Sequence, residues 1–151
     1  MSITKKYIEG FTRQLADALK IGQSIDVARQ GTDTRNIVIA GMVLANGNGL
    51  DRVIVRGIGP SLAPTFFPAS AVLANPTLEL RDGNGALLIS NNDWQDDVAQ
   101  AALIAAAGLA PTNNLESAIA ASLPPGLYTA ILAGFNNGTG IGLVEVYDLG
   151  P

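Results

Sequence analysis

The chain closes with the sequence LYTAILAGFNNGTGIGLVEVYDLG at residues 127–150. Two runs in it, Leu127–Ala133 and Gly142–Asp148, are rich in β-branched and aromatic residues, which favour strands. The loop between them contains Asn137-Gly138, and an Asn-Gly pair between two such runs predicts a β-hairpin. Apolar residues occupy both faces of the second run, so we expect this strand to lie inside a packed sheet. The stretch therefore predicts an antiparallel β-sandwich.

The rest of the chain continues this pattern of short strand-like runs separated by turn residues. Asp82-Gly83 or Asn84-Gly85 suits a tight hairpin turn, because these residues accept a positive φ at little cost. The predicted strands are Ser24–Arg29, Asn36–Leu44, Arg52–Gly57, Thr77–Arg81, Ala86–Ser90, Glu116–Leu123, Leu127–Ala133 and Gly142–Asp148. The number of these runs and the turn residues between them predict a mainly β fold, an antiparallel β-sandwich or jelly roll of about eight strands.

Residues 1–23 precede the first predicted strand. Apolar residues recur there at helical spacings, and Gly22 stands where a helix-ending glycine belongs. The resulting stripe consists of Tyr7, Ile8, Phe11, Leu15 and Leu19. An amphipathic helix of this kind packs either on its own domain or, as an arm, on a neighbouring subunit. We therefore divide the chain into an N-terminal helical arm, 1–23, and a β-sandwich domain, 24–151.

A short Ala-rich helix is predicted inside the second unit. Asp97–Ala107 consists largely of helix-forming residues, Gly108 is suited to end the helix, and Pro111 prevents its continuation. We expect this helix to close one end of the sandwich.

The loop Asn91–Asp97, with the sequence NNDWQDD, is the densest polar cluster in the chain. The residues that would supply oxygen ligands to Ca²⁺ are Asn92, Asp93, Asp96 and Asp97, although their spacing is not that of an EF-hand. In the structural interpretation, Asp93 caps the Ala-rich helix while Asp96 and Asp97 occupy its first turn. Trp94 either plugs the core beneath this loop or forms a platform for a sugar ring.

The chain contains no Cys and no His. It therefore lacks thiolate chemistry, the commonest transition-metal ligand and the usual general base near neutral pH. Most hydrolase triads are excluded, and a carboxylate pair of Asp93 with Asp96 or Asp97 is the one source of catalysis that we identify. We predict no catalytic residue and no cofactor, with Ca²⁺ as the alternative.

No run reaches the roughly 18 apolar residues of a membrane-spanning helix. Charged residues interrupt residues 1–21 where a signal peptide needs an apolar core. We therefore expect no membrane span and no secretion signal in the chain as written. The net charge of −4, without a patch of basic and aromatic residues, argues against nucleic-acid binding.

Charge is distributed unevenly along the chain. All nine Lys and Arg residues occur at or before Arg81, together with six acidic residues, so residues 1–81 carry a net charge of +3. Residues 82–151 carry seven acidic residues and no basic one. Either the composition drifts without consequence, or the molecule has two unlike faces that associate head to tail.

Arg52 and Arg56 lie four residues apart on a predicted strand, so both project from the same face. Two guanidinium groups on one face bind a carboxylate of a partner or a sugar acid, unless they pair locally with Asp51 or Glu79. Together with the apolar stripe of the arm, these arginines are our candidate interface residues.

The order of these segments resembles a β-sandwich module that recurs in large secreted and surface proteins of environmental bacteria. The resembling segments are Asn36–Leu44, Arg52–Leu62, Asn75–Leu80, Asn91–Trp94, Glu116–Ile119, Pro125–Ala130 and Gly140–Leu149. The second half is also similar to pre-peptidase C-terminal domains, through its Asp-Gly turn, Asn/Asp loop and Pro-Gly-x-Tyr hairpin. The resemblance implies a non-catalytic module for display, adhesion or assembly, located outside the cell or at its surface.

Two hypotheses for the function follow. In the first, the protein is a structural subunit of an extracellular or surface polymer, a homo-oligomer or filament. Its N-terminal segment docks on a neighbouring subunit, and open sheet edges accept added strands. In the alternative, the protein is a carbohydrate- or calcium-binding accessory module of a secreted protein, with a glycan as its partner.

Overall fold

The computed structural model describes residues 24–27, 37–45 and 49–151, the first of these ranges by its backbone alone. It contains two antiparallel sheets, so the predicted mainly β fold is confirmed. The strands are β1 (Ser24–Val27), β2 (Val38–Leu44), β3 (Asp51–Ile58), β4 (Pro76–Asp82), β5 (Leu87–Asn91), β6 (Ser117–Leu123), β7 (Gly126–Gly134) and β8 (Leu143–Asp148). Each predicted strand has a counterpart here within one or two residues. The predicted arm, 1–23, lies outside the described residues.

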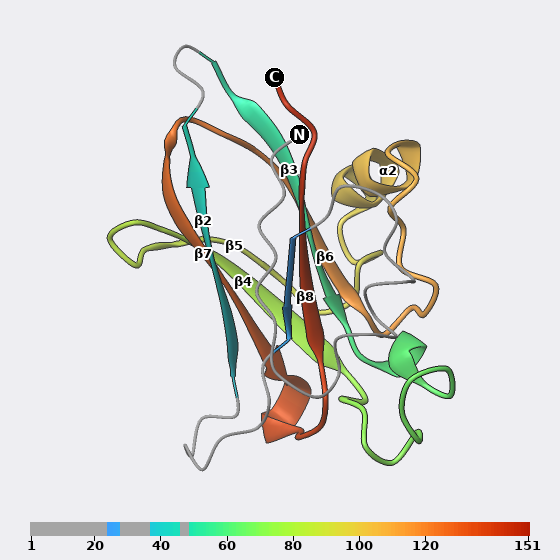
Figure 1. Cartoon of the computed structure of the whole chain (residues 1–151). Helices are drawn as coiled ribbons and strands as arrows, with labels where there is room; N and C mark the ends of the chain where they lie inside the picture. Colours follow the sequence, from blue (N-terminus) through green and yellow to red (C-terminus); the bar gives the residue numbers. More distant parts are fainter. Residues whose placement is uncertain (1–23, 28–36, 46–48) are drawn as a thin grey trace.

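Each of the first four strands pairs with at least one of the last four. Sheet A has the strand order β1-β8-β3-β6, and sheet B has the order β2-β7-β4-β5. The pairs β4–β5, β3–β6, β2–β7 and β1–β8 are therefore nested, like one long antiparallel ribbon wound into two layers (Figure 1). Strands far apart in the sequence consequently lie side by side within both sheets.

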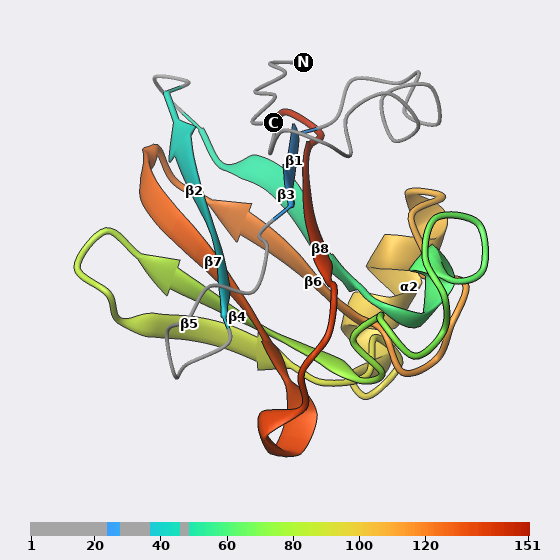
Figure 2. The same cartoon turned by 60° about the horizontal axis from the view of Figure 1, so that its bottom comes forward.

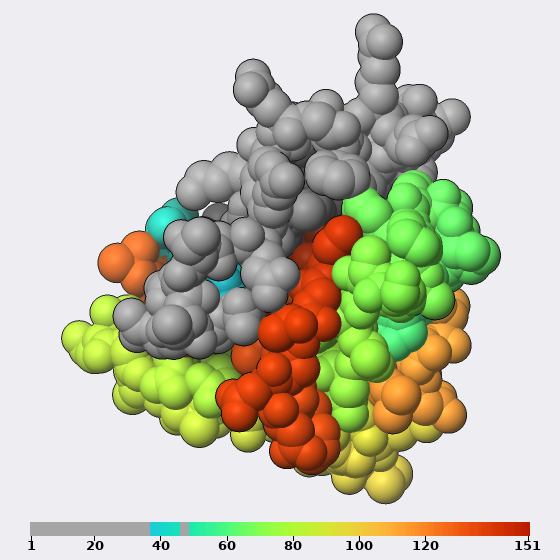
Figure 3. Space-filling model, turned by 90° about the horizontal axis from the view of Figure 1, so that it is seen from below, coloured from blue at the N-terminus to red at the C-terminus, as the bar shows by residue number. Residues whose placement is uncertain are grey.

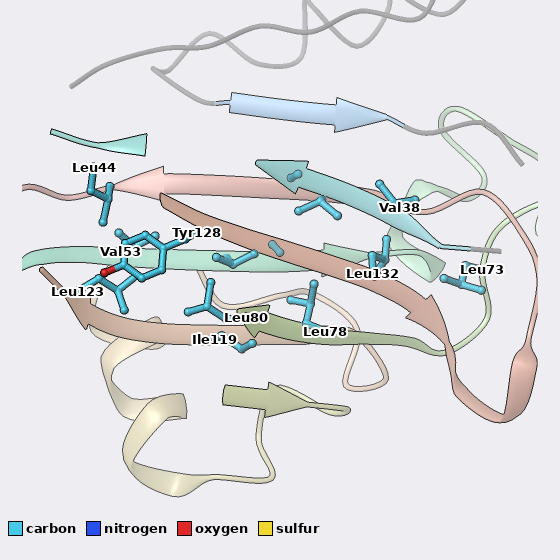
Figure 4. Close-up of a cluster of buried hydrophobic side chains, with 14 residues drawn as sticks. Val38, Leu44, Val53, Leu73, Leu78, Leu80, Ile119, Leu123, Tyr128 and Leu132 are labelled. Atoms are coloured by element: carbon cyan, nitrogen blue, oxygen red, sulfur yellow. The ribbon is translucent and has the colours of Figure 1, made fainter. Parts of the chain in front are cut away.

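The inner faces of the two sheets share one hydrophobic core (Figure 4). Along β3, Val53 and Val55 face this core, whereas Ile54 faces the opposite side of the sheet. The buried residues of the core are Val38, Ala40, Leu44, Val53, Val55, Leu73, Leu78, Leu80, Ile119, Leu123, Tyr128, Ala130, Leu132 and Val144. Burial of one large aliphatic side chain stabilises a fold by roughly 1.5–3 kcal/mol. The shared core is thus the main source of stability for the two layers.

β8 lies between β1 and β3 and is buried on both faces. Val144 contributes to the shared core, and Leu143 packs with Phe67 and Val72 in a smaller cluster at one end. Tyr147 belongs to a third cluster on the outer side of sheet A. The prediction that this strand lies inside a packed sheet is confirmed.

The predicted hairpin between the last two strands is wrong. β7 belongs to sheet B and β8 to sheet A, so their connection crosses from one sheet to the other (Figure 2). The connection begins with the short 3-10 helix η2 (Phe135–Asn137), in which Asn136 and Asn137 have φ of 50° and 59°. Ile141 then forms a bridge to Val72. The Asn-Gly pair turns the chain but pairs no strands, because residues 135–142 exceed the length of a two-residue hairpin loop.

The hairpin predicted at Asp82–Gly85 is confirmed. β4 pairs with β5, and Gly85 has a φ of 84°. The Asp82 carboxylate accepts hydrogen bonds from the backbone N–H groups of Asn84 and Ala86, each at 2.9 Å. Gly85 occupies the position that needs a positive φ, which glycine adopts without a steric penalty. This hairpin projects to one side of the molecule (Figure 2).

An α-helix, α2 (Val98–Ala106), covers the outer face of sheet A (Figure 1). Its Ile104 side chain is fully buried against Ile54, Ala118 and Tyr147. Trp94 is partly buried and packs against this cluster, which agrees with its interpretation as a core plug. Within the described ranges, no helix is long and apolar enough to cross a membrane.

The N-terminal cap of α2 is Asp97, and the prediction that Asp93 caps this helix is wrong. The Asp97 carboxylate accepts hydrogen bonds from the N–H groups of Ala99 at 2.9 Å and Gln100 at 3.0 Å. The helix starts immediately after Asp97, and a capping side chain reaches only the first turn, so Asp93 is too early in the chain. At the other end, Gly108 has a φ of 71°, as expected of the glycine that ends the helix.

Candidate functional site

Arg56 forms a buried charge cluster on the outer side of sheet A. Its Nε donates to Glu145 Oε2 at 2.6 Å, and its Nη2 forms an ion pair with the same carboxylate. Its Nη1 donates to the carbonyl of Leu109 at 3.1 Å, and the guanidinium carbon lies 5.2 Å from the ring centre of Tyr147. The Glu145 side chain is only 5% exposed. Arg56 therefore has an internal partner, and this partner is neither Asp51 nor Glu79.

Tyr147 completes this cluster. Burial and the neighbouring Glu145 carboxylate raise the pKa of Tyr147 above its usual value, despite the opposing effect of Arg56. The phenol thus stays neutral, and the aromatic face holds the guanidinium by a cation–π contact. This geometry fixes β3 and β8 to each other by side chains as well as by their backbone ladder.

Arg52, in contrast, is exposed. It lies beside a groove of about 450 Å³ between α2 and sheet A, whose lining includes Leu103, Ala106, Ala120 and Leu149. The two arginines share a face of β3, as predicted, but only Arg52 presents its side chain to solvent. A contact of either arginine with a partner stays a prediction.

Glu116 is a site residue that the sequence reasoning missed. It is fully buried just before β6. Its Oε1 accepts from the backbone N–H groups of Gly59 at 3.1 Å and Ser61 at 2.8 Å, and its Oε2 accepts from Ser61 Oγ at 2.7 Å. The Ser61 hydroxyl also lies 2.7 Å from Thr112 Oγ1. Glu116 therefore clamps the short 3-10 helix η1 (Pro60–Leu62), where the chain leaves β3, to the start of β6.

A small hollow of about 170 Å³ adjoins this clamp. Apolar side chains such as Leu62, Phe66 and Leu143 form part of its wall, beside Arg56 and Glu116. The charged groups in the wall already bind one another or the backbone. The rest of the wall is mainly apolar surface.

The loop before α2 brings together some of the predicted calcium ligands. Asp96 Oδ2 accepts from the backbone N–H of Asp93 at 3.2 Å, whereas Asp97 is used as the helix cap. Asn92 Oδ1 and Asp93 Oδ1 are buried without a hydrogen-bond partner. In the part of the chain that the structure describes, no three acidic, His or Cys side chains are grouped so as to hold a metal ion. Calcium binding at this loop stays a prediction.

Exposed apolar side chains lie on the outer face of sheet B, along β2 and β7. Ile39 and Val43 on β2 are 54% and 69% exposed, and Leu127 on β7 is 61% exposed. The strand register places Ile39 opposite Ile131 and Val43 opposite Leu127. We call these four residues the apolar row. The sequence could have revealed this row through the apolar residues on both faces of β2. A strand with one solvated face normally alternates apolar and polar residues.

Near the apolar row, β4 contributes a local ion pair. Arg81 donates from Nε at 2.9 Å and from Nη2 at 2.6 Å to the same oxygen of Glu79. The pair is half-exposed and neutral overall, so it contributes little stability. It therefore leaves the outer face of sheet B without a net charge between the apolar row and β5.

The described body is strongly acidic. Residues 37–45 and 49–151 contain three arginines and nine acidic residues, which gives a net charge of −6. Strands of both sequence halves alternate within each sheet, so the charge difference between the halves does not form two separate faces in this body. Two of the three arginines, Arg56 and Arg81, are bound to carboxylates of the same chain.

Comparison of the chain with protein-family models, with curated proteins and with solved structures finds no match.

Replacing Glu116 by Ala removes the acceptor of the buried Gly59 N–H and of the partly buried N–H and hydroxyl of Ser61, and a buried donor without an acceptor costs about 1–3 kcal/mol. We therefore expect Glu116→Ala to lower the free energy of unfolding by on the order of 3 kcal/mol in urea denaturation. Glu116→Gln is the matched control, since its carbonyl still accepts the two backbone bonds while its amide donates to Ser61. The clamp interpretation is wrong if the Ala and Gln variants are equally stable.

Burial and the nearby Asp96 carboxylate raise the pKa of Asp93 above its ordinary value of 3.8. A raised pKa in the folded state means that ionisation of Asp93 destabilises the fold at neutral pH, and that this cost disappears below pH 3.8, where both states are protonated. Asp93→Asn should therefore raise the melting temperature at pH 7 and leave it unchanged well below pH 3.8. An equal shift at both pH values would refute this origin.

Proposed function

We propose that this protein is a non-catalytic structural subunit that assembles with further copies of itself, outside the cell or at the cell surface. The observation that carries the proposal is the apolar row on the outer face of sheet B. The location follows from the resemblance of the sequence to modules of secreted and surface proteins. Assembly needs a stable body and a complementary surface, and it requires no reactive group.

We infer that the body is a jelly-roll β-sandwich. Eight strands in two sheets, with the four nested pairs described above, follow the strand order that winding an antiparallel ribbon produces. Such a body buries its inner faces completely and leaves function to its outer faces, edges and loops. A regular layered body of this kind is suited to repetition in a polymer or surface layer.

The apolar row is unusual for a surface that faces only water. Three of its four side chains are more than half exposed, and the register forms two cross-strand pairs, Ile39–Ile131 and Val43–Leu127, on either side of the Gly41–Thr129 pair. Contiguous apolar patches on a protein surface mark interaction sites more often than single exposed residues do. The row has no charged member, so an apolar partner can cover it without burying an unpaired charge.

The partner that fits the row is the apolar stripe within residues 3–21 of a neighbouring copy. That segment carries Lys5, Lys6, Arg13 and Lys20 against Glu9 and Asp17, a net charge of +2. Residues 24–151 contain five basic and eleven acidic residues, a net charge of −6, so the arm and the body as a whole carry opposite charge. Docking of an N-terminal arm on the next subunit is a head-to-tail contact, and such contacts build filaments unless they close into a ring.

The experiment compares the same substitution at two exposed valines of the full-length protein. Val43→Asp places a charge in the apolar row, whereas Val98→Asp places it on α2, where the side chain is 82% exposed. We expect Val43→Asp to abolish extended assemblies in negative-stain electron microscopy and light scattering, and Val98→Asp to preserve them. Phe11→Asp in the arm should reproduce the effect of Val43→Asp.

Two results would contradict this proposal. One is a monomer at every concentration for the unmodified protein. The other is an assembly that Val43→Asp and Phe11→Asp leave intact, since neither the row nor the arm would then be needed.

One observation favours the alternative of a calcium- or carbohydrate-binding module. Asn92 Oδ1 and Asp93 Oδ1 are buried without partners in the same loop, and a bound cation would supply the missing contact. Millimolar Ca²⁺ should then raise the melting temperature, and Asp93→Ala combined with Asp96→Ala should abolish the rise. Retention on a glycan column that Trp94→Ala removes would support the carbohydrate version. For the structural subunit we expect neither effect.

A further inference from the structure

Sheet A ends in β1 and β6, and the outer edge of β6 is partly covered. Along β6, the N–H of Ala118 donates to Asn91 Oδ1 at 2.9 Å, and the N–H of Ala120 donates to Gln100 Oε1 at 3.0 Å. Just before the strand, the carbonyl of Glu116 accepts from the N–H of Trp94 at 2.9 Å. Side chains and backbone from the loop and from α2 thus occupy three of the backbone groups that a neighbouring strand would need. Covering an edge in this way is a common protection against unwanted strand pairing.

Sheet B ends in β2 and β5, and β5 has no comparable cover within the described residues. The backbone of Leu87–Ser90 makes no hydrogen bond there outside its ladder with β4. Leu87 and Leu88 are 50% and 43% exposed. Figure 3 shows the yellow-green segment that contains this hairpin at the surface of the molecule. An edge with free backbone groups and exposed apolar side chains is a docking site for an added strand.

The residue composition of β5 favours an uncharged partner strand. Its sequence, LLISN, contains no charged residue, and the adjacent Glu79–Arg81 pair on β4 is neutral overall. A charged peptide would gain no ion pair here. The net negative charge of two copies opposes their association. Pairing through β5, however, places no two like-charged side chains opposite each other, because the strand has no charged residue. The β5 strand of a second copy is an uncharged apolar edge with the same free backbone groups.

We propose that two copies of this chain pair through β5 in antiparallel orientation, joining their B sheets into one continuous sheet across a two-fold axis. In such a contact each copy donates and accepts the same hydrogen bonds, so both edges are satisfied at once. The contact goes beyond the proposed function, because it uses neither the apolar row nor residues 1–23. A β5 pair closes on itself, whereas arm docking extends the assembly. With both contacts, the repeating unit of the polymer is a dimer.

The first test measures mass in the full-length Val43→Asp variant, in which arm docking is removed. We expect this variant to be a dimer by light scattering, with twice the chain mass of 15.5 kDa. Adding Leu88→Lys should reduce the mass to that of one chain, because a lysine on an edge strand opposes pairing. Adding Leu103→Lys instead, on α2 at a side chain that is 61% exposed, should leave the dimer intact.

The second test uses the absence of cysteine from the chain, which makes any introduced thiol unique. Leu88→Cys and Ser90→Cys, oxidised separately and as a mixture, should give covalent dimers in at least one of the three samples. Ser122→Cys, an exposed position on β6, is the control and should stay monomeric under the same conditions.

A monomeric Val43→Asp variant, or a dimer that Leu88→Lys leaves intact, would overturn the β5 pairing. So would cross-linking of Ser122→Cys that equals that of the β5 variants. If another segment or a foreign protein occupies β5, the β5 thiols do not reach each other and the proposal is wrong. These results leave arm docking standing, because they do not depend on the arm.

Discussion

The shared hydrophobic core between sheets A and B is the interaction on which the rest of the structure depends. It forms only if strands from both ends of the chain meet in each sheet, and the nested pairs achieve this. The same pairing brings Arg56 to Glu145, 89 residues apart, and Gly59 to Glu116, 57 residues apart. The two buried polar clusters are therefore consequences of the winding, and they fasten β3 to its neighbours where the chain leaves that strand.

Some apolar side chains lie outside this core, on the outer faces of the two sheets. On sheet A, the outer face is covered by α2 and by the loop that contains Trp94. The outer face of sheet B carries the apolar row, and the edge of the same sheet exposes Leu87 and Leu88. The contrast between a covered sheet and an open one within a single molecule is our reason for placing function on sheet B. Water exposure of several aliphatic side chains is costly, and the proposed contact with a second copy of the chain would remove that cost.

Much of the fold could be predicted from the sequence, because strand alternation and turn residues are local signals. They placed every strand within one or two residues, and the Asp82–Gly85 hairpin was recognised from its turn chemistry. The β7–β8 hairpin failed because a turn residue does not reveal that the chain changes sheets. The cap of α2 was misplaced from Asp97 to Asp93 because three aspartates precede the helix within five residues, and each has the chemistry of a cap.

The polar clusters and surfaces were harder to predict. From the sequence alone, Glu116 cannot be told from an ordinary solvated glutamate, because its partners belong to a distant segment of the chain. For Arg56, local acids such as Asp51 were the visible candidates, and its actual partner lies on β8. The apolar row and the open β5 edge depend on which strands end a sheet, and this depends on topology rather than on any one stretch of sequence.

The measurement that tests self-assembly most directly is sedimentation velocity of the unmodified full-length protein over a wide range of concentrations. The account predicts species heavier than the 15.5 kDa chain, with a dimer at low concentration and larger species as the concentration rises. A single boundary at the mass of one chain throughout the range would contradict it, since neither the apolar row nor the β5 edge would then have a partner in a second copy.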